Sequence, residues 1–176
     1  MAAGTSLPGS LREYQLALSD RLQNAGTGAR VASRLGVQVG EQGWLIDLTE
    51  AGEVIRPPAI AEVPLARAWF RGVANVRGNL YSVTDFSAFL GGEPTTVTEE
   101  ARLLLLNERY RSGAALLVGR SLGLRDTDEL ELRAPAGSSE PPPFVRALYA
   151  DSQGKLWKEL DVAALIQHPA FLEASL

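Results

Sequence analysis

The fold is decided by one stretch of this 176-residue chain, Trp69-Phe70-Arg71-Gly72-Val73-Ala74-Asn75-Val76-Arg77-Gly78-Asn79-Leu80. Residues 70–77 and 80–85 are two strand-like runs, and only Gly78-Asn79 separates them. Glycine and asparagine tolerate a positive φ, so the stretch predicts a β-hairpin with a primed two-residue turn.

More strands are predicted on both sides of this hairpin. Before it, apolar residues alternate with polar or small ones, which is the period of a half-buried strand. After it, short apolar runs flank polar turns, a pattern typical of further hairpins. The expected strands cover residues 31–39, 44–48, 102–106, 113–118, 144–149 and 155–160. The pattern predicts a mainly β fold, either one barrel or a pair of barrels.

An amphipathic helix is predicted near the start of the chain. Its apolar face consists of five residues at helical spacing: Leu7, Leu11, Tyr14, Leu18 and Leu22. Gly26 and Gly28 are expected to end it. Two readings stay open, because such a helix either packs on its own domain or docks onto a partner.

Two shorter helices are expected later in the chain. Either Thr84 or Asp85 is expected to cap a helix that ends at Gly91-Gly92. Asp161 is expected to cap another, which Pro169 breaks.

Composition excludes several classes of function. Hydrophobic residues make up 45% of the chain and charged residues 22%, as in ordinary soluble domains, and the formal net charge is -4. No basic face of the kind that binds nucleic acid is visible. The absence of cysteine excludes thiolate metal sites and cysteine nucleophiles. The longest apolar run, residues 103–106, is too short to span a bilayer, and the chain does not begin with a signal peptide, so a cytoplasmic protein is expected.

Catalytic groups are scarce. His168 is the only histidine, and a capping or surface role is expected for it at the end of the last helix. Four acidic residues cluster without the glycine of a calcium loop, which favours a solvated strand edge: Asp126, Asp128, Glu129 and Glu131. Neither a P-loop nor a Gly-x-Ser-x-Gly elbow occurs. The sequence therefore predicts a protein that is not an enzyme and holds no metal or cofactor.

Two segments resemble the signature of the CheW-like family of coupling proteins. They are the hairpin stretch 69–80 and Gly52-Glu53-Val54-Ile55-Arg56-Pro57-Pro58. In the family, a Glu-Val-(Ile/Leu) strand precedes a Gly-x-x-Asn-(Leu/Val)-Arg-Gly hairpin. Thr84-Asp85-Phe86 and residues 113–119 resemble later family motifs, and order and spacing agree over residues 31–166.

The resemblance implies a fold and a set of partners. The implied fold is two interlocked five-stranded β-barrels, which we place at residues 30–176, after an N-terminal extension over residues 1–29. Family members bind the regulatory domain of a CheA-type histidine kinase and the cytoplasmic tip of a methyl-accepting receptor. They hold both in one array at the membrane, without insertion into it and without turnover.

Residues 72–78, the N-terminal helix and residues 167–172 further resemble the pilus-linked subgroup of this family. For that subgroup the kinase is of the ChpA type, the receptor is of the PilJ type, and the output is twitching motility by type IV pili. A flagellar-type coupling protein is the alternative. A barrel that binds a small molecule between its lobes is a hypothesis from a different class, which needs convergent polar groups around a pocket.

The resemblance also implies which residues meet the partners. Glu53, Gly72 and Arg77 match family positions that matter for coupling. Two readings of Arg77 stay open, because its guanidinium can pair with a carboxylate of a partner or brace the two lobes. A groove for a receptor helix is expected to have aliphatic walls. The complete expected set is Ala51, Glu53, Val54, Gly72, Asn75, Val76, Arg77, Gly78 and Leu117.

Overall fold

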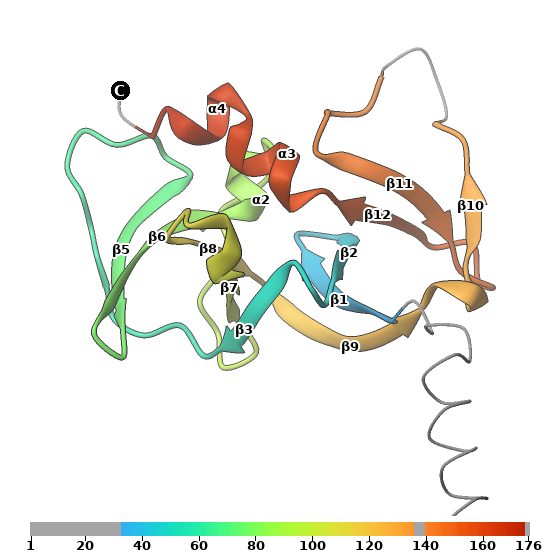
Figure 1. The fold of residues 1–176 in the computed structure, drawn as a ribbon, viewed down its shortest axis with the longest axis horizontal. Coiled ribbons are helices and arrows are strands. Elements are labelled where there is room, and N and C mark those ends of the chain that lie inside the picture. Colours follow the sequence, from blue (N-terminus) through green and yellow to red (C-terminus); the bar gives the residue numbers. More distant parts are fainter. Residues whose placement is uncertain (1–32, 136–139, 175–176) are drawn as a thin grey trace, which may run out of the picture. The chain divides into compact units, whose positions relative to one another are not determined.

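The computed structural model describes residues 33–135 and 140–174 (Figure 1). The predicted N-terminal extension, with its amphipathic helix, lies outside these residues, so the boundary at residue 30 stays a prediction. Residues 33–176 make up one compact unit. In the described part of the chain, no helix is both long and apolar enough to cross a membrane.

Two sheets hold the strands of the described residues, and each has six strands. The first sheet, called lobe 1, consists of β1 (Ser33–Val39), β2 (Gln42–Asp47), β9 (Arg120–Asp126), β10 (Glu131–Arg133), β11 (Val145–Ala150) and β12 (Leu156–Leu160). The second sheet, called lobe 2, consists of β3 (Ala51–Ile55), β4 (Ile60–Ala61), β5 (Phe70–Val76), β6 (Asn79–Asp85), β7 (Arg102–Leu106) and β8 (Ala114–Val118). The short helices are α2 (Phe86–Phe89), η1 (Glu108–Tyr110), η2 (Thr127–Glu129), α3 (Val162–Gln167) and α4 (Pro169–Leu172).

Both sheets curl so that their edges come together. The edge strands of lobe 1, β9 and β10, are joined by residues 127–130 alone, and those of lobe 2, β3 and β4, by residues 56–59. Links this short bring the opposite edges of each sheet close to one another. Besides β10 and β4, which have three and two residues, each sheet has five longer strands. This confirms the predicted mainly β fold with two five-stranded, barrel-like lobes.

The chain passes between the lobes several times. It leaves lobe 1 after β2 and returns after β8, where Gly119 alone separates β8 from β9. It leaves lobe 1 again after β12, and α3 and α4 lead back to lobe 2 (Figure 1). There the N–H of Arg67 donates to the carbonyl of Ala174 at 2.8 Å. These crossings interlock the two lobes.

The hydrophobic core lies largely where the lobes meet. Leu104 of β7 and Leu116 of β8 belong to a buried cluster that also holds Trp44 of lobe 1. Their neighbours Leu103 and Leu117 belong to a second buried cluster within lobe 2. Successive side chains of a strand point to opposite faces, so each apolar run supplies two cores.

The central hairpin differs from the prediction by one residue. Val76 pairs with Asn79, so the turn is Arg77-Gly78 and not Gly78-Asn79. Both turn residues have a positive φ, 53° and 89°, as in a type I′ turn. The side-chain oxygen of Asn75 accepts a hydrogen bond from the N–H of Gly78 at 2.8 Å. This bond closes the turn in the observed register.

The helix caps follow the predicted chemistry. Asp85, rather than Thr84, caps α2 by accepting a hydrogen bond from the N–H of Ala88 at 3.3 Å. Asp85 also accepts hydrogen bonds from the N–H and the hydroxyl of Thr95, at 2.7 and 2.8 Å, which ties the loop after α2 to the sheet. Asp161 caps α3, as expected.

Substitution of Leu117 tests the two-sided burial of β8. Leu117 is fully buried, so Leu117→Ala leaves a cavity and should lower the free energy of unfolding by about 2–5 kcal/mol. Leu80 lies on the adjacent strand β6 but is 68% exposed, and Leu80→Ala should change that free energy by less than about 0.5 kcal/mol. Urea unfolding of both variants measures the difference. Equal effects would contradict the placement of Leu117 in the core.

Candidate functional site

The predicted site residues lie in lobe 2, on β3, β5 and β8 and in the turn between β5 and β6. Five of them are exposed and form what we call the hairpin surface: Glu53, Val54, Asn75, Arg77 and Gly78. The other four are buried: Ala51, Gly72, Val76 and Leu117. Of these buried residues, Val76 still lines the hollow described below.

Arg77 and Glu53 form an ion pair between the hairpin turn and β3. Nη1 of Arg77 donates to both carboxylate oxygens of Glu53, at 2.8 and 2.9 Å. The two side chains are 72% and 49% exposed. The hydrogen bond and the charge of Glu53 raise the pKa of Arg77. Because both residues belong to lobe 2, the pair does not brace the two lobes, which corrects that reading of Arg77.

A hollow of about 370 Å³ lies beside this ion pair. Its walls include the largely buried residues Val76, Tyr81 and Leu105. Arg77 and the exposed Glu108 also line it. The hollow thus combines largely buried apolar side chains with exposed charged ones.

Gly72 is buried where β4 pairs with β5. Its φ is 125°, and a Cβ at this position would overlap the carbonyl oxygen of Ala61. Only glycine satisfies both conditions. Gly72 therefore shapes lobe 2 from a buried position, and its expected part in partner binding stays a prediction. The side chain of Leu117 is also fully buried, and its expected part in partner binding likewise stays a prediction.

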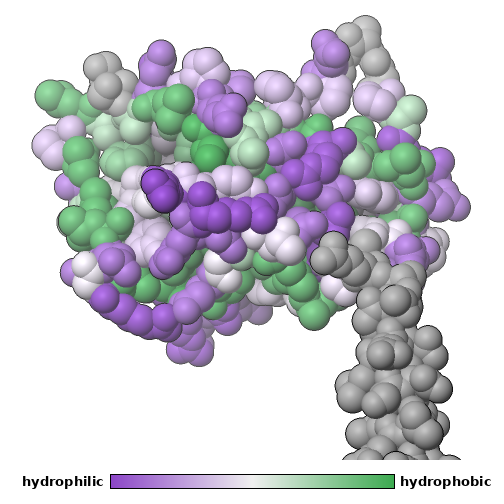
Figure 2. Space-filling model, viewed as in Figure 1, coloured by the Kyte–Doolittle hydropathy of each residue, from purple (hydrophilic) through white to green (hydrophobic). Residues whose placement is uncertain are grey.

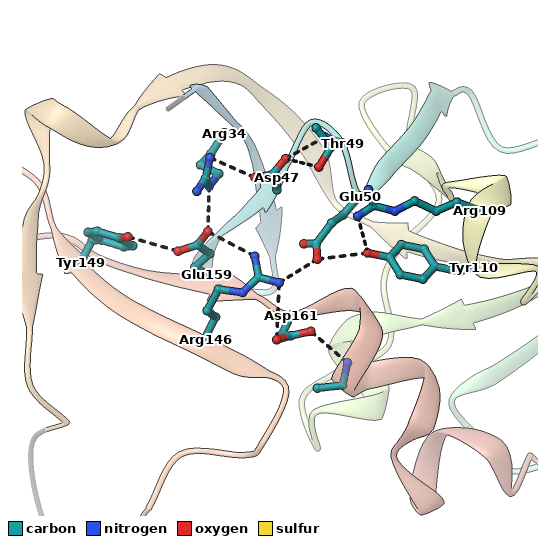
Figure 3. Close-up of polar contacts among 11 residues, drawn as sticks. Arg34, Asp47, Thr49, Glu50, Arg109, Tyr110, Arg146, Tyr149, Glu159 and Asp161 are labelled. Carbon is teal, nitrogen blue, oxygen red and sulfur yellow. Dashed lines mark hydrogen bonds and ion pairs between the residues drawn. The ribbon is translucent and has the colours of Figure 1, made fainter. Parts of the chain in front are cut away.

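A second cluster of charged residues lies where the lobes meet, and no sequence motif marked it (Figure 3). We call it the junction network, and its members are Arg34, Asp47, Glu50, Tyr110, Arg146, Tyr149, Glu159 and Asp161. Glu159 of β12 is only 2% exposed. It accepts hydrogen bonds from Nε of Arg34 at 2.7 Å and from the hydroxyl of Tyr149 at 3.1 Å. Arg34 also pairs with Asp47 of β2 at 3.2 Å.

Glu50 holds the other half of the junction network. It is 5% exposed and lies between β2 and β3, where the chain leaves lobe 1. Its Oε1 accepts hydrogen bonds from Nη2 of Arg146 at 2.7 Å and from the hydroxyl of Tyr110 at 3.1 Å. Arg146 also lies 3.4 Å from Asp161 and 3.7 Å from Glu159. One guanidinium thus contacts three carboxylates.

Burial and charge shift the pKa values within this network. Desolvation lowers the pKa of Arg146, but the hydrogen bond to Glu50 and the charges of the three carboxylates outweigh it, so the pKa is raised overall. Burial and then the charge of Glu159 raise the pKa of Tyr149. Arg146 therefore stays charged, and Tyr149 stays neutral, around neutral pH. Arg146 therefore contributes a positive charge to the network and Tyr149 a neutral hydroxyl.

Alternation along β12 bears on one member of the junction network, Glu159, and on no other. Trp157 and Glu159 are two residues apart on β12, so their side chains leave the strand on the same face. The pairs Arg34–Glu159 and Arg146–Glu50, however, join positions 125 and 96 residues apart, beyond the reach of any local pattern.

On the face drawn in Figure 2, hydrophilic residues gather across the middle, over the region where the lobes meet in Figure 1.

The other polar groups that stood out in the sequence have structural contacts. Asp126 caps η2 by accepting a hydrogen bond from the N–H of Asp128 at 2.9 Å. His168 lies between α3 and α4 and packs edge-on against Phe89 and Phe144, so it is more buried than a surface residue. Across residues 33–135 and 140–174, no group of three or more histidine, cysteine, aspartate or glutamate side chains is arranged to hold a metal ion.

Known proteins resemble this chain in sequence and in fold. The family model described as CheW-like domain matches residues 34–170. Protein PilI of Pseudomonas aeruginosa is 29% identical to the chain over 145 residues, which cover 81% of this chain and 80% of that protein. The crystal structure of the scaffolding protein TtCheW from Thermoanaerobacter tengcongensis superposes with a TM-score of 0.60 at 18% identity. That match covers 74% of this chain and 88% of the other, and at this identity it shows the fold alone.

Substitution of two glycines of the predicted set, Gly72 and Gly78, tests which of them the backbone requires. Gly72→Ala should lower the free energy of unfolding by about 3 kcal/mol or more, because the methyl group meets backbone and φ is positive. At Gly78, φ is also positive, but among the described residues no atom outside its two chain neighbours lies within 4 Å of the place that an added methyl group would occupy, so Gly78→Ala should cost only about 1 kcal/mol. Thermal and urea unfolding measure both values. A tolerated Gly72→Ala would contradict the structural role.

Asp47 makes part of the stability dependent on pH. Burial raises its pKa, but hydrogen bonds from Thr49 and the charges of Arg34 and Arg146 outweigh this, so the pKa is lowered from 3.8. A carboxyl whose pKa is lower in the folded state stabilises that state above pH 3.8 and loses the effect as pH falls through the folded value. The stability difference between the native chain and Asp47→Asn should therefore be constant above about pH 5 and shrink as pH falls below that value. Urea unfolding at a series of pH values measures it, and a difference independent of pH would contradict the shift.

Proposed function

The chain belongs to the CheW-like domain family, and from this premise we propose that it is a non-enzymatic coupling adaptor of a chemosensory system. The family model spans residues 34–170, which is nearly all of the chain that the structure describes. In this role the chain holds a CheA-type histidine kinase and a methyl-accepting receptor in one assembly and performs no turnover.

The observation that carries the proposal is the exposed Arg77–Glu53 pair on the hairpin surface. Ion pairs exposed to this degree contribute little to stability, so stabilisation of the fold is a poor explanation for the Arg77–Glu53 pair. A planar guanidinium that already accommodates a carboxylate also suits recognition of an acidic group on a partner. These considerations favour docking over bracing for Arg77.

The receptor tip is the partner that suits the shape of this surface. A helical hairpin presents apolar side chains one turn apart, and such helices bind in shallow grooves with apolar walls and charged rims. The hollow beside Arg77 offers Val76 and Tyr81 as walls, and Val54 is exposed on the neighbouring strand. The regulatory domain of the kinase is the second proposed partner, as in the family at large.

We further propose that the output is type IV pilus twitching motility. This rests on the similarity to the Protein PilI of Pseudomonas aeruginosa over 80% of its length. The kinase is then of the ChpA type and the receptor of the PilJ type, and the chain works in the cytoplasm at membrane arrays. A twitching defect on deletion, with swimming intact, would support this assignment. The reverse pattern would support a flagellar-type coupling protein instead.

Calorimetry with purified components tests the adaptor function. The native chain should bind the regulatory domain of a CheA-type kinase or the receptor tip saturably, and Arg77→Ala should weaken binding to at least one of them by about tenfold or more. Arg133→Ala is the matched control, because Arg133 is also an exposed arginine paired with a glutamate, Glu131, but lies in lobe 1. Neither variant should change the melting temperature by more than about 2 °C.

Three outcomes of this experiment oppose parts of the proposal. A large loss of melting temperature in Arg77→Ala would show that the residue is a brace. Equal binding by Arg77→Ala and the native chain would remove the hairpin surface from the interface. No binding to either partner would oppose the adaptor function itself and favour a barrel that binds a small molecule, which thermal-shift screening with metabolites would detect.

A further inference from the structure

We propose that Arg146 is a positioning residue that, acting through Glu50, holds the start of β3 against lobe 1 and thereby sets the place of the hairpin surface. The inference rests on the proposed function in one respect, because it takes the hairpin surface, which includes Glu53 and Val54 of β3, to be a docking surface. Arg146 itself lies on β11 of lobe 1 and belongs to neither the hairpin surface nor the hollow beside it.

The guanidinium of Arg146 joins two places where the chain passes between the lobes (Figure 3). Glu50, 2.7 Å away, stands between β2 and β3, where the chain leaves lobe 1. Asp161, 3.4 Å away, stands between β12 and α3, where the chain leaves lobe 1 again. A single side chain of lobe 1 therefore contacts both exits.

Glu50 transmits this contact to lobe 2 through bonds of its own. Its carbonyl accepts a hydrogen bond from the N–H of Asn107 at 3.1 Å, and the side chain of Asn107 donates to the carbonyl of Thr49 at 3.1 Å. The hydroxyl of Tyr110 donates to the same carboxylate oxygen that Arg146 contacts. The next residue, Ala51, begins β3, so the position of Glu50 determines where the strand starts.

Glu50 depends on Arg146 more than Glu159 does. Oε1 of Glu50 receives both hydrogen bonds, and its buried Oε2 has no hydrogen-bond partner among the residues that the structure describes. Without Arg146, Glu50 would be a buried carboxylate that has lost its ion pair, which is unfavourable. A cation left nearby would be Arg109, which donates to the hydroxyl of Tyr110 at 2.7 Å and so reaches Glu50 through that hydroxyl. Glu159 would retain Arg34 at 2.7 Å and the hydroxyl of Tyr149. Loss of Arg146 should therefore act on the segment around Glu50 and leave β12 in place.

β3 is the strand that would respond. It is an edge strand that pairs with β7 alone, and its register shifts between Ala51 and Val54. Edge strands with such irregularities are held by fewer ladder hydrogen bonds than central strands. A shift of Glu50 toward water would move Ala51 and, three residues from Glu50, Glu53. The ion pair of Glu53 with Arg77 would move with it.

Hydrogen exchange measured by mass spectrometry on the free chain tests the proposal. In Arg146→Met, the protected amides of β3 and that of Asn107 should exchange about tenfold faster or more, while those of β8 and β12 keep their native rates. Arg133→Ala is the control from the same lobe and should change neither set. A uniform increase over both lobes would overturn the proposal, because it would show a general loss of stability, and unchanged exchange at β3 would overturn it as well.

A second pair of variants tests whether the effect passes through Glu50. Glu50→Gln removes the buried charge that Arg146 neutralises, so adding Arg146→Met to Glu50→Gln should raise exchange at β3 less than Arg146→Met raises it in the native chain. If the two substitutions instead raise the exchange rate at β3 by independent factors that multiply in the double variant, the route through Glu50 is overturned. Arg146→Lys keeps the charge and should restore part of the protection at β3.

Binding then separates this inference from the proposed function. If the chain binds the kinase domain or the receptor tip, Arg146→Met should weaken the binding that depends on Arg77, although Arg146 lies outside the hairpin surface. Faster exchange at β3 with undiminished Arg77-dependent binding would overturn the docking part of the inference. Faster exchange at β3 in a chain that binds neither partner would leave the positioning role supported and the adaptor function opposed.

Discussion

The burial of β7 and β8 on both faces is the constraint on which the rest of the structure depends. Leu104 and Leu116 face lobe 1, while Leu103 and Leu117 face the interior of lobe 2. Two strands that serve two cores must lie where the lobes meet, so neither lobe can separate without exposing apolar surface. The crossings of the chain, the curled sheets and the exposed hairpin surface are all arranged around this pair of strands.

The buried apolar side chains of β7 and β8 hold the lobes together, but the junction network fixes how one lobe is oriented relative to the other. Hydrophobic contact is non-directional, whereas hydrogen bonds and ion pairs lose strength when their geometry changes. Arg146 contacts Glu50 and Asp161 at two exits from lobe 1, so a rotation between the lobes would strain both contacts. The exposed pair of Arg77 and Glu53 is different in kind, because water can replace either partner there.

Local patterns predicted much of the fold and part of the candidate site. The strands around the hairpin and the cap at Asp85 agree with the expectations. Glu53 and Arg77, which the family resemblance named, are exposed, and their part in docking stays a prediction. The predicted hairpin turn, Gly78-Asn79, is wrong by one residue. The prediction considered only the turn preference of glycine and asparagine, whereas the hydrogen bond that Asn75 accepts from Gly78 sets the observed turn at Arg77-Gly78. Leu117 was expected near the docking groove, and alternation along β8 directs its side chain into the core of lobe 2.

What the sequence by itself determined is what neighbours within a few residues decide: strand alternation, turn and cap chemistry, and the motifs that mark a CheW-like domain. What only the tertiary structure decided is which charges meet. Arg34 and Glu159 are 125 residues apart and Arg146 and Glu50 are 96 apart, yet each pair lies within 2.7 Å. No local pattern encodes such contacts, because they form only when folded strands from both lobes bring their side chains to one buried place.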